Sequence, residues 1–310
     1  MHLDLFKTFL AVAKKGSISR ASEELYLTQP AVTKQIQALE QIYERTLFER
    51  NHKPFTLTEE GEILIEYANR ILSLLDESHA SVKDKDKDLT GKLNISSNYT
   101  LGIYIIPMII KFFRDVYPQV QVEVFLANTD TVVKAIKRRE AHFGFIGIHM
   151  DESLITLHSF YQDKLLVVIG AHHRLKRGVG HWSELLGIPF IGREKGSDIR
   201  ATYETWLDQK GIRVEASIEL NSTEAIKSCV QAGLGFSILP WCTVEQEVRL
   251  GLIRTVSVPY FNVVQEFYIC HYRDRAFSRV EKVFLEAIFN RLSVGAPRFP
   301  ESFAGLFSKK

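Results

Sequence analysis

The sequence predicts an all-α N-terminal domain with the pattern of a winged helix-turn-helix, followed by an α/β domain. Apolar residues between positions 6 and 39 recur at helical spacing in short segments, and the last of these segments has a second, polar face. From Lys92 onward, strand-like and helix-like segments alternate, which predicts parallel strands covered by helices. One long amphipathic pattern joins the two parts.

Two short helices open the chain. The first has one apolar face, formed by Phe6, Phe9, Leu10 and Ala13. Gly16 suits its C-terminal end, because glycine readily adopts the left-handed conformation that stops many helices. Ser17 and Ser19 can cap the second helix, which runs to Leu25, and residues 26–28 then form a tight link.

A third helix, over residues 28–39, has two faces of different chemistry. Its apolar stripe consists of Val32, Ile36 and Leu39, and its polar face of Gln29, Thr33 and Gln37, with Lys34 beside them. Thr28 suits the N-cap, and Pro30 is tolerated in the first turn. Glutamine, threonine and lysine side chains can reach base edges and phosphates in the major groove of DNA. Alone, this pattern indicates an ordinary surface helix, but its place after a short helix and a tight turn favours a DNA-recognition helix.

Residues 46–57 change from helical to extended spacing. Asn51, His52 and Pro54 supply turn chemistry, so a small hairpin, or wing, is predicted there. The hairpin carries the basic side chains of Arg50, His52 and Lys53. A solvated loop explains three basic residues more simply, but this loop follows the recognition helix, where it can straddle the DNA backbone.

At this point the chain resembles the LysR-type transcriptional regulators. The matching segments, in order and spacing, are 9–13, 16–25, 28–36, 39–40, 47–50 and 57–61. Family members often have serine and arginine where this chain has Thr33 and Lys34. Lysine cannot form the two-pronged hydrogen bond to guanine that arginine forms. The resemblance therefore assigns the base-reading role to Gln29 and Thr33 in preference to Lys34.

The expected DNA contacts fall into two sets. The residues expected at base edges are Gln29, Pro30, Thr33 and Gln37. The residues expected at the sugar-phosphate backbone are Ser17, Ser19, Arg20, Lys34, Arg50, His52 and Lys53.

Charge and composition limit the partners. The 310 residues carry a formal net charge of +2, so strong non-specific binding to nucleic acid is not predicted. Affinity must come from a few placed contacts, doubled by a dimer. No apolar run suits a membrane span, and the first residues lack a signal-peptide core. The 3 cysteines are widely spaced and support neither a disulfide scaffold nor a zinc site. We therefore expect no metal and no cofactor. Free cysteines suit a reducing compartment, so we expect a cytoplasmic location.

A long helix is predicted over residues 59–82, with Thr58 as its cap. Its apolar residues recur at spacings of three and four and form a narrow stripe: Ile63, Leu64, Tyr67, Ile71, Leu74, Leu75 and Val82. Residues 58–90 are acidic, and an acidic helix is not expected to lie along DNA. A homodimer seam is therefore favoured over packing on its own domain. A charged spacer over 83–88 and a hinge at Thr90-Gly91 follow.

These patterns divide the chain into a DNA-binding domain (1–58), a linker and dimerisation helix with its hinge (59–90), an effector-binding domain (91–294) and a tail (295–310). The resemblance implies that the effector-binding domain has two lobes, like a periplasmic binding protein, with an effector cleft between them. The chain is expected to cross between the lobes near residues 162–164 and 264–267. Lobe one is then 92–162 plus 267–294, and lobe two is 163–266.

Polar residues follow several predicted strands, at the positions where ligands bind in such folds. Each of them is more simply explained as a helix N-cap. Several in one domain, together with a nearby arginine, predict a small anion or carboxylate as ligand. The expected effector contacts are Ser97, Asn98, Tyr99, Thr100, Asn128, Thr129, Gly147, Arg193, Ser197 and Ser222.

Within the family, segments 99–107, 193–197 and 232–235 resemble the branch of carbon-fixation and sulfur-assimilation regulators. Asp198-Ile199 stands where Gly-Thr is often found after Gly-Ser. An acid at this position can repel an anionic ligand, which argues against a phosphorylated or sulfur-oxyanion effector.

The predicted function is a LysR-type regulator whose binding to promoter DNA is modulated by a small anionic or polar metabolite. The resemblance implies a homotetramer that bends double-stranded DNA, and RNA polymerase is a further candidate partner. The alternatives are a cytoplasmic solute-binding module and an enzyme fused to a DNA-binding head. No catalytic motif in the sequence supports the enzyme.

Overall fold

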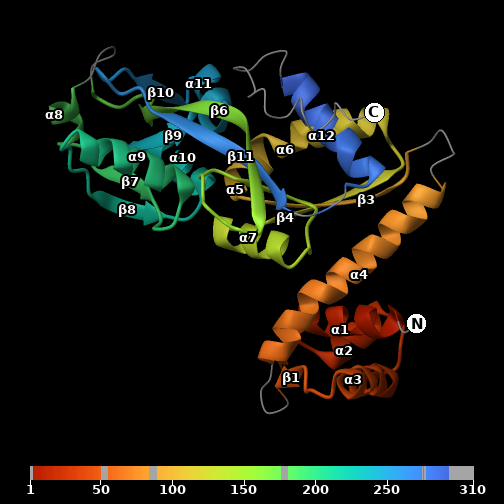
Figure 1. Ribbon diagram of the computed structural model, residues 1–310. Helices are drawn as coiled ribbons and strands as arrows, with labels where there is room; N and C mark the ends of the chain where they lie inside the picture. The colour runs from red at the N-terminus through yellow and green to blue at the C-terminus, as the bar shows by residue number, and fades with distance from the viewer. Residues whose placement is uncertain are drawn as a thin grey trace. The chain divides into compact units, whose positions relative to one another are not determined.

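The computed structural model describes residues 3–49, 55–83, 89–175, 181–273, 275 and 277–292. The chain divides into two compact units, Met1–Asp88 with Lys137–Ala141, and Leu89–Ile136 with His142–Lys310. Figure 1 shows the N-terminal unit in red and orange. Within the described ranges, no helix is long and apolar enough to cross a bilayer.

Four helices and a small hairpin build the N-terminal unit. The helices are α1 (Leu3–Lys15), α2 (Ile18–Glu24), α3 (Gln29–Tyr43) and α4 (Glu59–Lys83). The hairpin pairs β1 (Phe48–Glu49) with β2 (Thr56–Leu57) in antiparallel register. Its connecting residues, which include Arg50, His52 and Lys53, lie outside the described residues, so their predicted DNA contacts stay predictions.

Local chemistry explains where the first helices begin and end. Gly16 has a φ of +59° directly after α1, as the sequence predicted for a stop. The Ser17 hydroxyl, rather than that of Ser19, caps α2 by accepting from the Arg20 N–H at 3.4 Å. Thr28 caps α3 in the same way. The apolar faces of all four helices then meet in one core, whose buried members include Phe9, Val12, Ala21, Val32, Leu39, Leu47, Leu64 and Ala68.

The C-terminal unit is built on a nine-stranded sheet in the order β4-β3-β5-β11-β6-β9-β7-β8, with β10 beside β6. The strands are β3 (Gly91–Ser97), β4 (Val120–Leu126), β5 (Phe143–Ile146), β6 (Ile155–Gly170), β7 (Phe190–Arg193), β8 (Ala216–Leu220), β9 (Phe236–Pro240), β10 (Ile253–Val256) and β11 (Val264–Tyr272).

The sheet is mixed, whereas the βα alternation predicted parallel strands. β3 is parallel to β4 and β5, and β7 is parallel to β8 and β9. β6 and β11 run antiparallel through the middle, with Lys164 opposite Val264. The first part of β6 pairs with β11, and its last part pairs with β9 and β10. We call the half with β3–β5 lobe one and the half with β7–β10 lobe two.

Helices cover the sheet in both lobes. They are α5 (Tyr99–Tyr104), α6 (Ile106–Val116), α7 (Thr129–Lys137), α8 (Trp182–Leu185), α9 (Asp198–Gln209), α10 (Thr223–Gln231), α11 (Trp241–Arg249) and α12 (Arg279–Leu292). The apolar spacing over 104–117 predicts one helix, interrupted near its start by Pro107. Instead α5 ends at Tyr104 and α6 begins at Ile106, because proline is favoured in a first turn, where no intrahelical donor is lost.

Each lobe has its own apolar core. Phe113 and Phe284 pack edge to face in lobe one, with ring centroids 5.2 Å apart. Phe190 and Phe236 pack at 5.1 Å in lobe two. The strands β6 and β11 join the two cores, and the polar residues that follow β3, β4 and β7 lie between them.

Candidate functional site

The outer face of α3 presents the side chains that the sequence assigned to base edges. Gln29, Pro30 and Gln37 are exposed, and Thr33 is half-buried. The Thr33 hydroxyl donates to the Gln29 carbonyl at 3.0 Å, which leaves its lone pairs and methyl group turned outward. The opposite face of α3 holds Val32, Ile36 and Leu39 in the core, so the helix cannot rotate its polar side inward.

The expected backbone contacts surround this face. Ser19, Arg20 and Lys34 are exposed, and Ser17 is half-buried because it caps α2. All four lie on α2, its cap or α3, in one unit of the fold.

Sequence reasoning missed Tyr26, which lies in the turn between α2 and α3. Its side chain is 96% exposed, and its φ of 54° is a left-handed conformation that non-glycine residues rarely adopt. An exposed aromatic residue at the entry to a recognition helix can lie against a sugar or phosphate. The signal was present in the sequence as a large residue in an otherwise tight turn.

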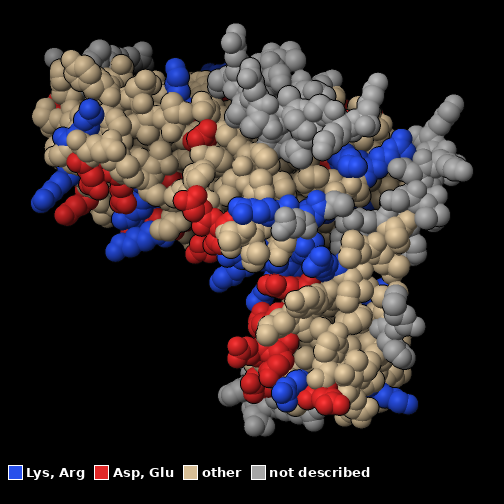
Figure 2. Space-filling model, in the orientation of Figure 1, with Lys and Arg blue, Asp and Glu red and all other residues tan. Residues whose placement is uncertain are grey.

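The long helix α4 has two apolar faces, where the sequence predicted one stripe. Leu64 belongs to the buried core of the N-terminal unit, together with Ile65 and Ala68. Ile63, Tyr67 and Leu74 are each more than half exposed. Figure 2 shows acidic side chains gathered over the first turns of α4, where Glu59, Glu60 and Glu62 lie.

The C-terminal unit brings most of the expected effector residues to one small cavity. The predicted residues that line it are Asn98, Tyr99, Thr100, Asn128, Thr129, Arg193 and Ser197. Of the others, Ser97 is fully buried and donates to the Asn98 carbonyl, and Ser222 caps α10 by accepting from the Ala225 N–H at 3.3 Å. The cavity has a volume of about 30 Å³, which suits one or two water molecules rather than a metabolite.

Asp198, at the start of α9, occupies the centre of this cluster. Its carboxylate accepts from Asn98 Nδ2 at 3.0 Å, from the Thr129 hydroxyl at 2.7 Å and from the Gly147 N–H at 2.8 Å. Burial raises the pKa of the Asp198 carboxyl, and these three hydrogen bonds oppose that rise by stabilising the charged form. From the sequence, Asp198 was recognised only as a departure from the family pattern, and it was not expected to be part of the site.

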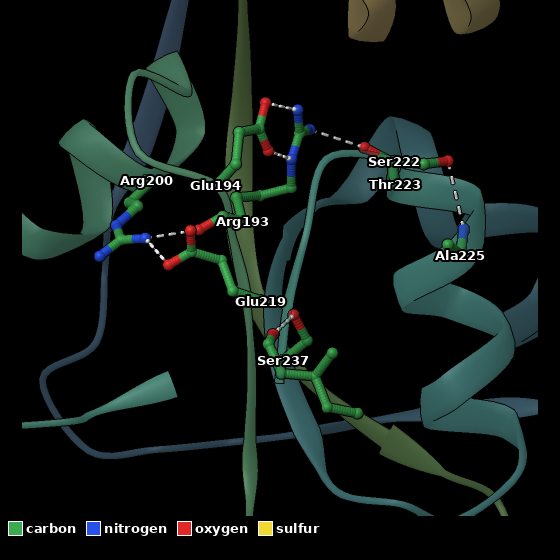
Figure 3. Close-up of polar contacts among 9 residues, drawn as sticks. Arg193, Glu194, Arg200, Glu219, Ser222, Thr223, Ala225 and Ser237 are labelled. Atoms are coloured by element: carbon green, nitrogen blue, oxygen red, sulfur yellow. Dashed lines mark hydrogen bonds and ion pairs between the residues drawn. The ribbon is translucent and has the colours of Figure 1, made fainter. Parts of the chain in front are cut away.

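Arg193, expected to hold an anion, is already paired (Figure 3). Its Nε and Nη2 donate to the two carboxylate oxygens of Glu194 at 2.7 and 2.9 Å. Its Nη1 donates to the Thr223 hydroxyl at 2.9 Å. The guanidinium is buried, so it supports the cavity wall and offers a ligand little free charge. Neither Glu194 nor Thr223 was among the effector contacts expected from the sequence.

A second contact joins the lobes beside this cluster. The Tyr104 hydroxyl of α5 donates to the Glu224 carboxylate of α10, and Lys227 Nζ lies 5.0 Å from the centre of the Tyr104 ring. Burial and the neighbouring Glu224 raise the pKa of Tyr104, so the phenol stays protonated and remains a donor.

Comparison with known proteins agrees with this arrangement. The family described as LysR substrate binding domain matches residues 86–293, and the bacterial regulatory helix-turn-helix protein, lysR family, matches residues 3–62. A probable RuBisCO transcriptional regulator of Cyanidioschyzon merolae is 32% identical over 295 residues, which cover 93% of this chain and 97% of that protein.

Two solved structures share the fold. Full-length CbnR complexed with its target DNA has a TM-score of 0.65 and 22% identity, and covers 93% of this chain and 99% of its own. The CcmR regulatory domain of Synechocystis, in complex with 2-PG, has a TM-score of 0.59 and 23% identity, and covers 64% of this chain and 96% of its own. The chain therefore belongs to the LysR family of transcriptional regulators, which are DNA-binding proteins with an effector-binding domain and not enzymes.

Proposed function

We propose that the N-terminal end of α3 enters the major groove of a promoter and reads base edges with Gln29, Thr33 and Gln37. The observation that carries this proposal is the division of α3 into a buried apolar side and an exposed polar side that begins at its first residue. Lys34 and Arg20 then hold the sugar-phosphate backbone. The complex of CbnR with its target DNA supports DNA as the partner of this fold. The site of action in this proposal is the compartment that holds the DNA, which we take to be the cytoplasm.

A second copy of the chain covers the outer face of α4 in this proposal. Ile63, Tyr67 and Leu74 form an exposed apolar surface on a helix of 25 residues, and a two-helix seam would bury it. A dimer places two recognition helices on one duplex. The second helix adds affinity for DNA that the modest net charge of the chain does not supply. Two such dimers form the homotetramer.

The effector in this proposal is a small polar metabolite that binds between the two lobes of the C-terminal unit. Separate cores allow each lobe to move as a body about β6 and β11, and the complex of the CcmR regulatory domain with 2-PG supports a ligand site in this domain. Relatives named RuBisCO transcriptional regulators make carbon-fixation genes the first targets to examine. A ligand that moves the equilibrium from 1:99 to 99:1 must bind one state better by about 5.5 kcal/mol.

A footprint of the full-length protein on the DNA upstream of its own gene tests the proposal. Thr33→Ala should weaken binding to the footprinted site and leave binding to unrelated DNA unchanged. Lys34→Ala should weaken both alike and reduce the salt slope by about one unit. Lys111→Ala, which removes an exposed lysine on α6 of the other unit, is the control for loss of a surface charge. No protected region at modest ionic strength would refute the proposal, and so would identical behaviour of the Thr33 and Lys34 variants.

A further inference from the structure

A carboxylate of lobe two fills a ring of hydrogen-bond donors that belongs to lobe one. Asp198 begins α9 of lobe two, whereas its partners are Asn98 at the cap of α5, Thr129 at the start of α7, and the Gly147 N–H directly after β5. Both carboxylate oxygens are used, because the Thr129 hydroxyl lies 2.9 Å from Oδ1 and 2.7 Å from Oδ2. The carboxylate thus joins the two lobes without any added ligand.

The donors around Asp198 are neutral, so the cluster is an anion-binding site rather than an ion pair. Arg193 acts on the carboxylate only through its charge, and its guanidinium is already bonded to Glu194 and Thr223. An amide, a hydroxyl and a backbone N–H that converge on one point are typical of sites that bind a small oxyanion. In this chain the oxyanion is covalently attached to the protein.

Gly147 shows that the approach of Asp198 is close. A Cβ added to Gly147 would lie 2.9 Å from Asp198 Oδ2 and 3.0 Å from Asp198 Cβ, which is tighter than ordinary contact. The buried Gln265 side chain donates to the Gly147 carbonyl, which belongs to the next peptide group along the chain. Hydrogen bonds on both of its backbone groups therefore hold Gly147 in place beside the carboxylate.

We infer that Asp198 is a built-in occupant of the anion subsite in the effector cleft, and that it determines which effectors the cleft accepts. This inference rests on the proposed function of the cleft. With Asp198 in place, the donors are satisfied, the lobes are held together, and about 30 Å³ of space remains in the cavity. A small anion therefore cannot bind to these donors in the wild-type protein. An effector must instead donate hydrogen bonds to Asp198, as an amine or hydroxyl group does.

Removal of the carboxylate should convert the cleft into a site for free small anions. Asp198→Ala leaves the Asn98, Thr129 and Gly147 donors in place, and acetate supplies the missing carboxylate. We expect acetate, compared with chloride at equal ionic strength, to raise the Tm of full-length Asp198→Ala by about 2 °C or more at saturation. Wild type and Asp208→Ala, which removes an exposed carboxylate from the same helix, should not respond.

Hydrogen exchange gives a second measurement on the same variants. The Gly147 amide should exchange faster in Asp198→Ala by about tenfold or more, and acetate should restore its protection. Should the alanine variant fail to fold, Asp198→Ser serves in both measurements, because its side chain is too short to span the lobes.

Two results would overturn the inference. One is an equal acetate response in wild type and variant, and the other is a folded variant that acetate does not stabilise, whatever its exchange rate. The wild-type promoter footprint is scored separately. Its absence refutes the proposed DNA function and leaves the acetate result standing, whereas a normal footprint without an acetate response refutes only the role of Asp198.

Discussion

Replacement of Gln29 by alanine isolates a single base contact of the proposed recognition helix. Gln29 is the first residue of α3, it is exposed, and its side chain packs on nothing in the core of the N-terminal unit. The fold should therefore tolerate the change. A good bidentate contact between a glutamine amide and adenine contributes ~1–3 kcal/mol of discrimination. Since ~1.4 kcal/mol corresponds to a factor of ten, each half-site should lose about five- to 150-fold in discrimination at one base pair.

The assay is a fluorescence anisotropy titration at fixed salt on the footprinted site and on duplexes with each base pair changed singly. Gln29→Ala should flatten the preference at one position in each half-site and leave the other positions as in wild type. Gln41→Ala, an exposed glutamine near the other end of α3, is the matched control and should change nothing. An equal loss of affinity on every duplex, or a preference pattern identical to that of wild type, would show that Gln29 does not read a base.

Three further predictions concern association and stability. Tyr67→Glu, on the exposed face of α4, should dissociate the dimer at micromolar concentration without unfolding the protein, and sedimentation that shows an unchanged assembly would rule out this seam. Ser222→Ala should lower the free energy of unfolding by about 1 kcal/mol in a urea titration, because it removes the cap that accepts from Ala225; no change would mean that water replaces the cap. Burial and the neighbouring His271 lower the pKa of His158 from 6.5 to about 4, so the native state binds fewer protons than the unfolded state in this range. Stability should therefore fall as the pH drops from 6.5 towards 4, and His158→Asn should flatten that fall; equal slopes would contradict it.

Local sequence patterns were sufficient for the first three helices of the N-terminal unit. The helix boundaries follow from Gly16, Ser17 and Thr28, which act on their own neighbours within a few residues. The apolar stripe of α3 became buried and its polar face exposed, because a helical period fixes both faces at once. The same period could not divide the apolar residues of α4 between its own core and its outer surface, since Leu64 and Ile63 are adjacent in the sequence and point to different sides.

Tertiary pairing decided the rest of the α/β unit. The alternation of strands and helices predicted the βα elements, but it could not show that β6 and β11 run antiparallel to each other where the lobes join. Strand order depends on contacts between segments 100 residues or more apart, such as Lys164 with Val264. The tertiary structure also decided the role of Arg193. A sequence pattern shows that an arginine lies near a predicted ligand site, but it does not show that the guanidinium already forms an ion pair with Glu194.

The sequence by itself determined that this chain carries a DNA-recognition helix ahead of an α/β effector domain, because spacing and capping act locally. Only the tertiary structure decided what fills the effector cleft. Asp198 lies 100 residues from Asn98 and 51 from Gly147 along the chain, and folding brings its carboxylate to within 3.0 Å of both donors. The sequence shows that an aspartate stands at the start of a helix, where it can act as a cap or supply a charge. It does not show which hydrogen-bond donors lie near that aspartate, because these belong to the other lobe.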